Sequence, residues 1–399
     1  MTEPRTKLSG TVVRLGVVSL LSDMASELIV PLMPIFLTGV LHASNAFVGA
    51  IDGAADTVSS FSKVLAGRYS DKRSKRKPLV FAGYTLAALV RPLIALATAP
   101  WHVLAIRITD RIGKGVRTAP RDAWIASVAS DKDRARSYGF HRAMDNAGNC
   151  LGPLLGLILY KFFNLPLRWV FACAAIPGAL ALLALYLTPE GDMEVAEAVS
   201  VNAPTLKANA PIPGALKVFF GVLFLFTLAN ASDSFIILQA KATGATETQI
   251  LIVWTAFAGL RSLLSTPGAM LSDYLGRRMT LVLGWFVFAL AFAAFAFASS
   301  IWTIAGVLVI YALHYALTEG TERALVADIA PARSRGFAFG VFHGTIGLGA
   351  LPASLIFGAI ADAQTLRVAF LVSATTAFVA ALLLLLVVRV GSSTRAKAA

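Results

Sequence analysis

The sequence has few charged residues. Asp, Glu, Lys and Arg make up 14% of its 399 residues, whereas an average soluble domain contains about 25%. The mean hydropathy is +0.72, and the apolar residues form many runs of roughly 20 residues, long enough to cross a bilayer core as a helix. The runs are continuous and do not alternate in polarity, which excludes a transmembrane β-barrel. We therefore predict an all-α polytopic membrane protein.

Residues that carry redox, metal or covalent chemistry are also scarce. The two cysteines, Cys150 and Cys173, both lie inside apolar runs, so no disulfide framework is expected. The sequence contains no His-Glu-x-x-His, no Gly-x-Ser-x-Gly and no Gly-x4-Gly-Lys-Ser/Thr motif. We predict that the protein is not an enzyme, holds no metal or cofactor, and is not driven by ATP.

The net charge of +13 could indicate binding to nucleic acid. The basic residues, however, gather in alternate loops between the apolar runs, as in segments that face the cytoplasm. We therefore predict no nucleic-acid partner, two cytoplasmic termini and insertion in the inner membrane of a bacterium.

The apolar runs define twelve expected membrane spans in two sets of six. The expected limits are 12–39, 45–67, 78–98, 101–124, 137–162, 166–187, 215–241, 247–270, 279–299, 302–326, 335–361 and 367–389. A segment rich in acids and prolines follows the sixth span, which is typical of a linker. The predicted domains are residues 1–187, a cytoplasmic linker at 188–213, and residues 214–399.

The two halves resemble each other. GRYSDKRSKRK after the second span pairs with AMLSDYLGRRM after the eighth, and GNCLGPLLG in the fifth span pairs with GLGALPASL in the eleventh. Two separate matches at nearly the same offset favour an internal duplication. A six-plus-six repeat is typical of transporters in which two bundles rock about a central site.

GRYSDKRSKRK resembles the cytoplasmic signature of the major facilitator superfamily (MFS). The residues expected to form a conformational latch are Gly67, Asp71, Lys72 and Arg76 in the first copy, with Asp273, Arg277 and Arg278 in the second. Ser74 stands where the signature has glycine. A carboxylate at one helix end facing a helix N-terminus and basic side chains could stabilise one arrangement of the bundles. The alternative is a plain basic loop.

The fifth span resembles the Gly-x3-Gly-Pro-x-x-Gly signature of the 12-span drug:proton antiporter branch. The matching residues are Gly148, Gly152, Pro153 and Gly156. Glycines four apart allow helices to approach closely, and the proline bends the span. The resemblance implies an exporter, although ordinary helix packing would also explain the pattern.

The fourth span contains RITDRIGKGVRTAPRD at 107–122, in which seven of sixteen residues are charged. At about 100° per residue, all seven fall within a sector of about 140°. A bare charge at the bilayer centre costs at least ~2.5–3.5 kcal/mol, so this face must contact protein or water. Arg111 and Gly115 match the superfamily's signature for this span, which places Arg111 in the cavity.

Acidic residues on neighbouring spans could balance this face. Asp23 and Glu27 in the first span are four residues apart, as are Asp52 and Asp56 in the second, so each pair shares a helix face. Either these groups form a fixed salt-bridge network, or one carboxylate exchanges a proton with substrate. Burial raises the pKa of a carboxyl and a nearby arginine lowers it. We favour exchange at Asp23 and Glu27.

The predicted substrate cavity combines both halves. Its expected residues are Arg107, Arg111, Lys114, Asn146, Asp233 and His314, although a lone membrane histidine is often a packing residue. We predict a monomeric secondary transporter of small organic molecules in the lipid bilayer, which acts by alternating access and exports its substrate in exchange for protons. The alternative is a transporter of organic anions, such as phosphate esters or siderophore-like molecules, bound by the basic face of the fourth span.

Overall fold

The computed structural model describes residues 8–70, 76–129, 134–189, 213–331 and 335–387. Helices account for the regular structure of these residues, and no strand occurs among them. The first half comprises α1 (Gly10–Glu27), α2 (Met33–Gly39), α3 (Asn45–Ser70), α4 (Lys77–Val90), η1 (Arg91–Leu96), α5 (Pro100–Val128), α6 (Arg134–Leu157), η2 (Ile158–Phe162), α7 (Leu167–Ala172) and α8 (Ala175–Tyr186). The second half comprises α10 (Gly214–Ala229), α11 (Ser234–Ala242), α12 (Glu247–Leu275), α13 (Arg277–Ala296), α14 (Ile301–Ile329), α15 (Arg335–Ala363) and α16 (Leu366–Val387).

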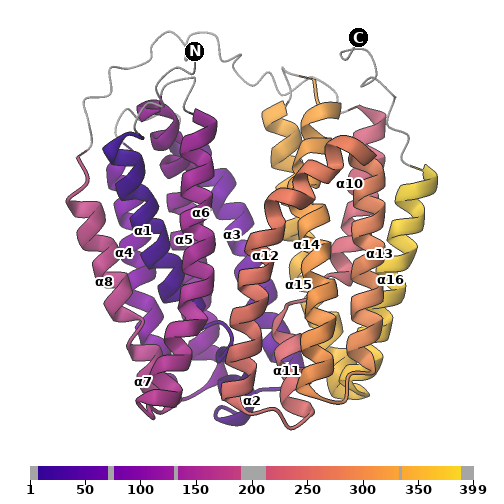
Figure 1. The fold of residues 1–399 in the computed structure, drawn as a ribbon, viewed down its shortest axis with the longest axis horizontal. Helices are drawn as coiled ribbons and strands as arrows, with labels where there is room; N and C mark the ends of the chain where they lie inside the picture. Colours follow the sequence, from indigo (N-terminus) through magenta and orange to yellow (C-terminus); the bar gives the residue numbers. More distant parts are fainter. Residues whose placement is uncertain (1–7, 71–75, 130–133, 190–212, 332–334, 388–399) are drawn as a thin grey trace.

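The helices form two bundles that stand side by side (Figure 1). We call the end at which α1 begins and α16 ends the terminal side, and the end at which α2 and α11 lie the opposite side. The interval between α8 and α10 contains the predicted linker, most of which lies outside the described residues.

The first rod of each half is interrupted. α1 ends at Glu27 and α2 resumes at Met33, with Pro31 and Pro34 unable to donate backbone hydrogen bonds. α10 ends at Ala229 and α11 begins at Ser234. Short polar side chains that bond to the backbone favour such a break, and the Ser232 hydroxyl accepts from the Ser234 amide at 3.1 Å. Residues of both interruptions, Val30 in the first and Asn230 to Asp233 in the second, line the pocket described below.

Eight helical segments of the described residues are long and apolar enough to cross a membrane. The described helices also join into twelve consecutive rods, in the predicted order. The four rods outside the eight are α1 with α2, α3, α5, and α6 with η2. Each carries acidic or basic residues, which lower the hydropathy. The all-helical fold is confirmed, and the count of twelve spans stays a prediction.

The two halves are held together internally by different chemistry. The second half buries an aromatic core in which Phe226 stacks on Trp285 at 4.2 Å and Phe288 stacks on Phe292 at 4.0 Å. The first half also has an apolar core and in addition buries charged side chains, including Arg91 and Asp110. Apolar packing tolerates sliding better than a set of buried ion pairs, which is stable only while every charge keeps its partner.

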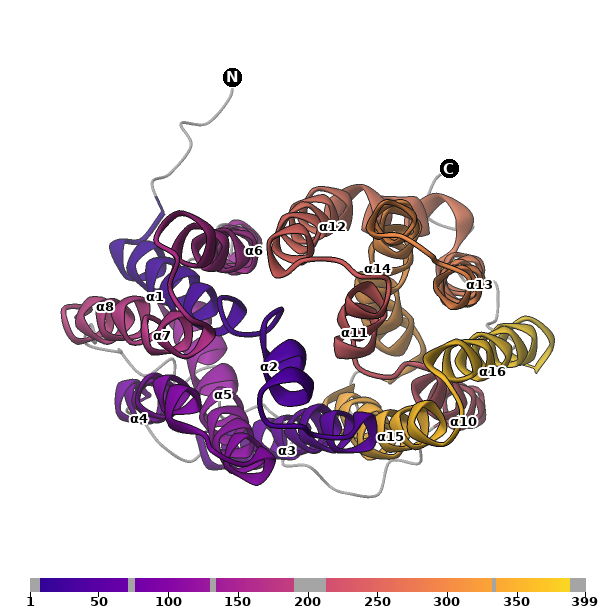
Figure 2. The same ribbon diagram turned by 90° about the horizontal axis from the view of Figure 1, so that it is seen from below.

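The halves meet closely along α3 and α15, which lie side by side, as do α6 and α12 (Figure 2). A methyl group added to Gly49 would lie 2.1 Å from the Ser354 carbonyl oxygen, and one added to Gly358 would lie 2.5 Å from the Asn45 carbonyl oxygen. Backbone therefore touches backbone where these glycines lie, and the interface admits no larger residue without moving the bundles.

Candidate functional site

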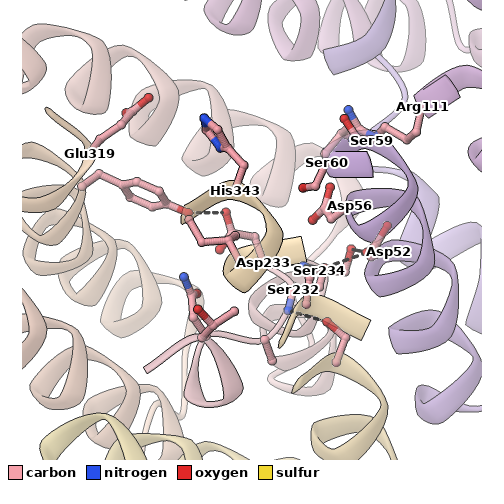
Figure 3. Close-up of a pocket in the computed structure, with 18 of the residues that line it drawn as sticks. Asp52, Asp56, Ser59, Ser60, Arg111, Ser232, Asp233, Ser234, Glu319 and His343 are labelled. Carbon is pink, nitrogen blue, oxygen red and sulfur yellow. Dashed lines mark hydrogen bonds between the residues drawn. The ribbon is translucent and has the colours of Figure 1, made fainter. Parts of the chain in front are cut away.

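A pocket of about 470 Å³ lies between the two halves, within the range of roughly 300–1,000 Å³ that small-molecule sites occupy. Figure 3 shows Asp56 and Arg111 on its first-half wall and Asp233, Glu319 and His343 across from them. The pocket begins at the broken segment between α10 and α11 and continues toward the terminal side along α3 and α14.

The pocket is lined mostly by polar and charged groups. Its ionisable and histidine residues are Asp52, Asp56, Lys63, Arg107, Arg111, Asp233, Glu319, Glu322, Arg323 and His343. Trp254, Tyr315 and Phe342 supply aromatic surface. Such a lining suits a hydrophilic solute with some unsaturated or ring character better than an entirely apolar molecule.

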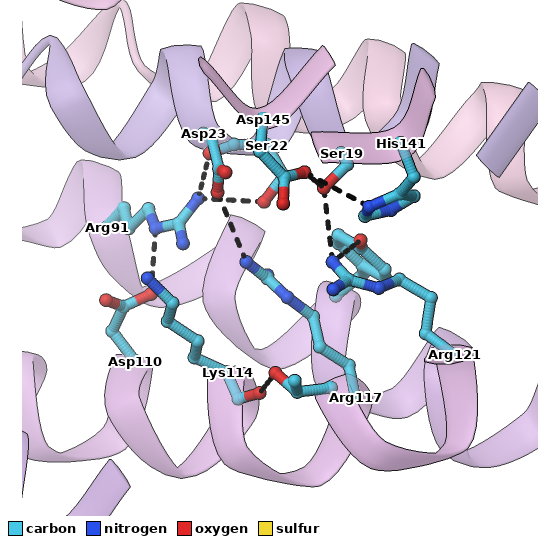
Figure 4. A network of polar contacts seen from close by, with 12 residues as sticks. Ser19, Ser22, Asp23, Arg91, Asp110, Lys114, Arg117, Arg121, His141 and Asp145 are labelled. Atoms are coloured by element: carbon cyan, nitrogen blue, oxygen red, sulfur yellow. Dashed lines mark hydrogen bonds and ion pairs between the residues drawn. The ribbon is translucent and has the colours of Figure 1, made fainter. Parts of the chain in front are cut away.

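The charged face of α5 lies inside the first half, as the sequence predicts. Arg107, Asp110 and Arg117 are all buried. Asp110 accepts from Arg91 Nε at 2.8 Å, and its other oxygen lies 3.9 Å from Arg107 Nη1. Arg91 also donates to the Ser22 carbonyl oxygen at 2.7 Å, and Figure 4 shows these groups together. Asp110 thus neutralises Arg91 and shares Arg107 with a second carboxylate, that of Asp52.

Asp52 connects this buried network to the second half. One carboxylate oxygen lies 3.6 Å from Arg107 Nη2. The other accepts from the Ser232 hydroxyl at 2.7 Å and from the Ser234 hydroxyl at 2.5 Å. Ser232 lies in the break between α10 and α11 of the other half, and Ser234 is the first residue of α11. Asp52 is therefore a buried carboxylate whose partners come from both halves.

The carboxylates predicted to couple protons lie beside the pocket and not among its lining residues. Asp23 is 3.8 Å from Arg117 Nη2, and Arg117 also lies over the Tyr84 ring at 4.1 Å. Glu27 makes no ion pair within the described residues and is within electrostatic reach of Lys114. Both acids remain inside the first half, where a proton gained or lost would change the charge of the α5 network.

The glycine motif of the fifth span lies on α6 against α1. A methyl group added to Gly148 would be 2.5 Å from the Leu20 carbonyl oxygen, and one added to Gly152 would be 2.7 Å from Glu27 Cβ. Gly156 lies next, 3.4 Å from the Leu28 carbonyl oxygen by the same construction, and Pro153 stands within the helix. The motif therefore brings α6 against the two predicted coupling residues.

A second polar cluster belongs to the other half. Asp233 accepts hydrogen bonds from Tyr311 at 2.7 Å and from Tyr315 at 3.0 Å. The Arg261 guanidinium lies 3.6 Å from the centre of the Tyr315 ring and 3.6 Å from Glu319. Asp233 was predicted to line the cavity, and the pocket does include it.

Arg142 and Glu319 form an ion pair between the halves. Arg142 lies on α6 and is half exposed, whereas Glu319 lies on α14 and faces the pocket. Glu319 also has Arg261 as a partner within its own half. This ion pair joins α6 of the first half to α14 of the second.

Three predicted cavity residues lie elsewhere in the described structure. His314 is buried in the aromatic core, where its Nδ1 donates to the Gly284 carbonyl oxygen at 2.9 Å and its ring lies 5.0 Å from that of Phe288. Lys114 faces α1 near Asp23. Asn146 lies on α6 outside the pocket lining. His314 is therefore a packing residue, the alternative given above, because a hydrogen-bonded ring buried in a core cannot contact a solute.

Only some residues of the predicted latch belong to the part of the chain that the structure describes. Asp71 and Lys72 lie outside the described residues, as do the surroundings of Gly67 and the side chain of Asp273. Arg76 donates to the Ala123 carbonyl oxygen at 2.5 Å. Arg277 lies 3.4 Å from Asp328, and Arg278 donates to the Leu384 carbonyl oxygen at 3.3 Å. These arginines tie helix ends within their own halves, and the latch stays a prediction.

Several site residues were not singled out from the sequence. They are Arg91, Ser232, Ser234, Tyr311, Tyr315, Arg261, Arg142 and Lys63. A lone arginine in the third apolar run was a usable signal for Arg91, because intramembrane charges are seldom incidental. The serines and tyrosines carry no such signal, since these residue types are common in membrane helices.

Comparison with known proteins now decides the family. The profile of the Major Facilitator Superfamily matches residues 15–236 and 218–399. An uncharacterized MFS-type transporter of Methanocaldococcus jannaschii is 33% identical over 388 residues, which cover 96% of each chain. The chain belongs to the major facilitator superfamily. It is therefore a membrane transporter of small substrates that works by alternating access, and not an enzyme.

More distant proteins resemble this chain in sequence or in fold. The multidrug resistance protein MdtH of Photorhabdus laumondii is 25% identical over 338 residues, covering 83% of this chain and 82% of that protein. A mutant of the nucleoside transporter NupG has a TM-score of 0.76 at 14% identity and covers 94% of this chain and 99% of its own. The D-xylose-proton symporter has a TM-score of 0.75 at 17% identity, covering 94% and 96%. The solved structures share the fold.

Proposed function

We propose that this MFS transporter is a proton-coupled exporter of small polar organic molecules. The supporting observation is a pocket between the halves whose acidic and basic groups are contiguous with the buried charges of α5. A change of protonation at one carboxylate would alter the charge balance next to the solute. The likeness to MdtH is consistent with export. The proposed setting is a bacterial inner membrane, with a monomer whose terminal side faces the cytoplasm.

Alternating access would use the two faces of the interface. The halves touch on the opposite side, where α2 lies against α11 (Figure 2) and Gly358 lies against α3. Rocking about the pocket would separate these contacts and bring the terminal ends together. Asp52 would lose Ser232 and Ser234 in that motion and would keep Arg107, so its proton affinity would depend on the state of the carrier.

The direct test is solute flux in vesicles that contain the purified protein. A ligand found by thermal-shift screening should move against its gradient when a pH gradient is imposed. The flux should stop when a protonophore collapses that gradient. Flux that ignores the pH gradient and continues with the protonophore would contradict proton coupling.

A second candidate function is transport of organic anions, and Arg111 favours it. Arg111 lines the pocket, makes no ion pair within the described residues, and has a buried Nε without a hydrogen-bond partner. An anion would supply the missing acceptor. Arg111→Gln should then abolish binding of anionic ligands and leave neutral ligands bound. Unchanged binding of every ligand would exclude this candidate.

A further inference from the structure

Three cations on the pocket wall have no hydrogen-bond or ion-pair partner among the described residues. Lys63 comes from α3, Arg111 from α5 and Arg323 from α14. Within the described residues, none of the three side chains makes an ion pair or a hydrogen bond. An unpaired charge in a membrane protein faces water or a bound ligand, because lipid cannot stabilise it. These three groups face the pocket.

Most of the pocket's acids, in contrast, already have donors. Asp52 is held by Ser232, Ser234 and Arg107, and Glu319 is held by Arg142 and Arg261. Two tyrosines bind Asp233, and Trp285 Nε1 lies 3.5 Å from Glu322. Only Asp56 is exposed to the pocket without a described partner. The hydrogen-bonding capacity left unused in the pocket is therefore mainly cationic.

The three cations come from both halves of the protein. Lys63 and Arg111 belong to the first half and Arg323 to the second, and Lys63 is within electrostatic reach of Asp56 and of both arginines. Lys63 is seven residues beyond Asp56, about 10 Å closer to the terminal side at 1.5 Å per residue. Like charges that face each other across an interface oppose its closure. Repulsion between Lys63 and Arg323 therefore opposes motion that brings α3 and α14 together, and Asp56 on α3 offsets part of that repulsion.

We propose that Lys63, Arg111 and Arg323 bind the oxyanion head group of the transported solute, a carboxylate or a phosphate. The inference deepens the second candidate function and depends on it. A head group held by both halves cancels their repulsion, so the terminal side closes readily only around a bound anion. The same three residues would then select the substrate and prevent the empty carrier from changing state by this route.

The charge of the wall can be measured without knowing the substrate. Ile346 lines the pocket on α15, and Ile346→Cys in a Cys150→Ser, Cys173→Ser background places one thiol there. Its reaction rates with anionic ethylsulfonate and cationic trimethylammonium methanethiosulfonates are compared. Their ratio cancels changes in thiol reactivity and reports the local potential. Lys63→Gln, Arg111→Gln and Arg323→Gln together should lower the ratio about tenfold or more. Lys217→Gln, at an exposed lysine of α10, should leave it unchanged.

Binding is tested by protection of the same thiol. Phenyl phosphate and benzoate should slow its modification by a neutral methanethiosulfonate, and benzyl alcohol should not. The triple variant should lose protection by both anions. Protection by only one of the two would assign the head group as phosphate or as carboxylate.

Two results would overturn the proposal. An unchanged rate ratio in the triple variant would show that the wall is not cationic. A lowered ratio with equal protection in both proteins, or with no protection by either anion, would show that the cations do not bind a head group. Neither measurement uses a pH gradient, so proton-coupled export can fail or succeed separately.

Discussion

Asp362, near the end of α15, binds the beginning of α3 in the other half. One carboxylate oxygen accepts from the Asn45 backbone nitrogen at 2.9 Å and from Asn45 Nδ2 at 2.8 Å. The other accepts from the Ala46 backbone nitrogen at 2.8 Å. The first amides of a helix have no partner within it and attract a carboxylate. One half thus caps a helix of the other, on the side where the halves touch.

Asp362→Asn should weaken closure of the opposite side. An amide keeps one acceptor oxygen but turns an NH2 group toward a backbone donor. Losing a helix cap costs about 1 kcal/mol, which shifts the ratio of the two states about fivefold. Modification of Ile346→Cys by an impermeant thiol reagent from the opposite side should accelerate accordingly. Thr365→Ala removes a cap on α16 within one half and should have no such effect. Equal acceleration in both variants would contradict the conclusion that Asp362 stabilises the closed opposite side.

Gly53 should tolerate no side chain in the present arrangement. A methyl group there would lie 2.7 Å from Leu351 Cα and 2.9 Å from the Ala350 carbonyl oxygen, and backbone cannot rotate away as a side chain can. Gly53→Val should push α3 from α15, favour opening on the opposite side, and slow transport at least tenfold. Gly340→Ala has open space around it and serves as the control. Normal flux in Gly53→Val would show that the contact is dispensable.

Asp110→Asn should destabilise the first half strongly. Its carboxylate is the partner of Arg91 and lies next to Arg107, and all three side chains are buried. Removing one partner of a buried ion pair costs about 3–5 kcal/mol, because the remaining charge stays buried. Thermal unfolding in detergent should therefore begin well below that of the parent protein. Asp328→Asn, at the exposed pair with Arg277, should change stability by no more than about 1 kcal/mol.

Asp23→Asn and Glu27→Gln should abolish proton-driven transport and preserve ligand binding or exchange. Asp23 also neutralises the buried Arg117, so its variant should unfold more readily, whereas Glu27→Gln breaks no described ion pair. This difference separates a structural effect from a coupling effect. Asp56→Asn makes the matched change at a pocket acid that has no partner among the described residues. If gradient-driven transport survives in both Asp23→Asn and Glu27→Gln, the proton site lies elsewhere.

Periodicity and motif spacing predicted features that depend on residues close together in the sequence, such as the charged face of a helix. The seven charges of 107–122 could be assigned to one helix face, and the structure buries several of them inside the first half. Arg107, Arg111 and Asp233 could be expected at the pocket, and they line it. His314 could not be assigned correctly from one residue type, because a histidine in a core and a histidine in a cavity have the same local sequence.

Partners distant in the chain were beyond sequence reasoning. Asp52 and Ser232 are separated by 180 positions, and Asp362 and Asn45 by 317. Neither pair follows from helix periodicity, because each depends on how the two bundles lie against each other. The break between α10 and α11, which presents both serines to Asp52, was expected to be continuous helix.

The sequence by itself determined the class of protein: its apolar runs require a membrane, its repeat requires two related bundles, and its charged helix requires a polar interior. Only the tertiary structure decided which charges meet. Helix faces are set by local geometry, whereas ion pairs between helices depend on distances of a few ångströms between segments far apart in the chain. For that reason the lack of an ion pair at Lys63, Arg111 and Arg323 within the described residues became visible only when most of the neighbouring acids were seen with their partners.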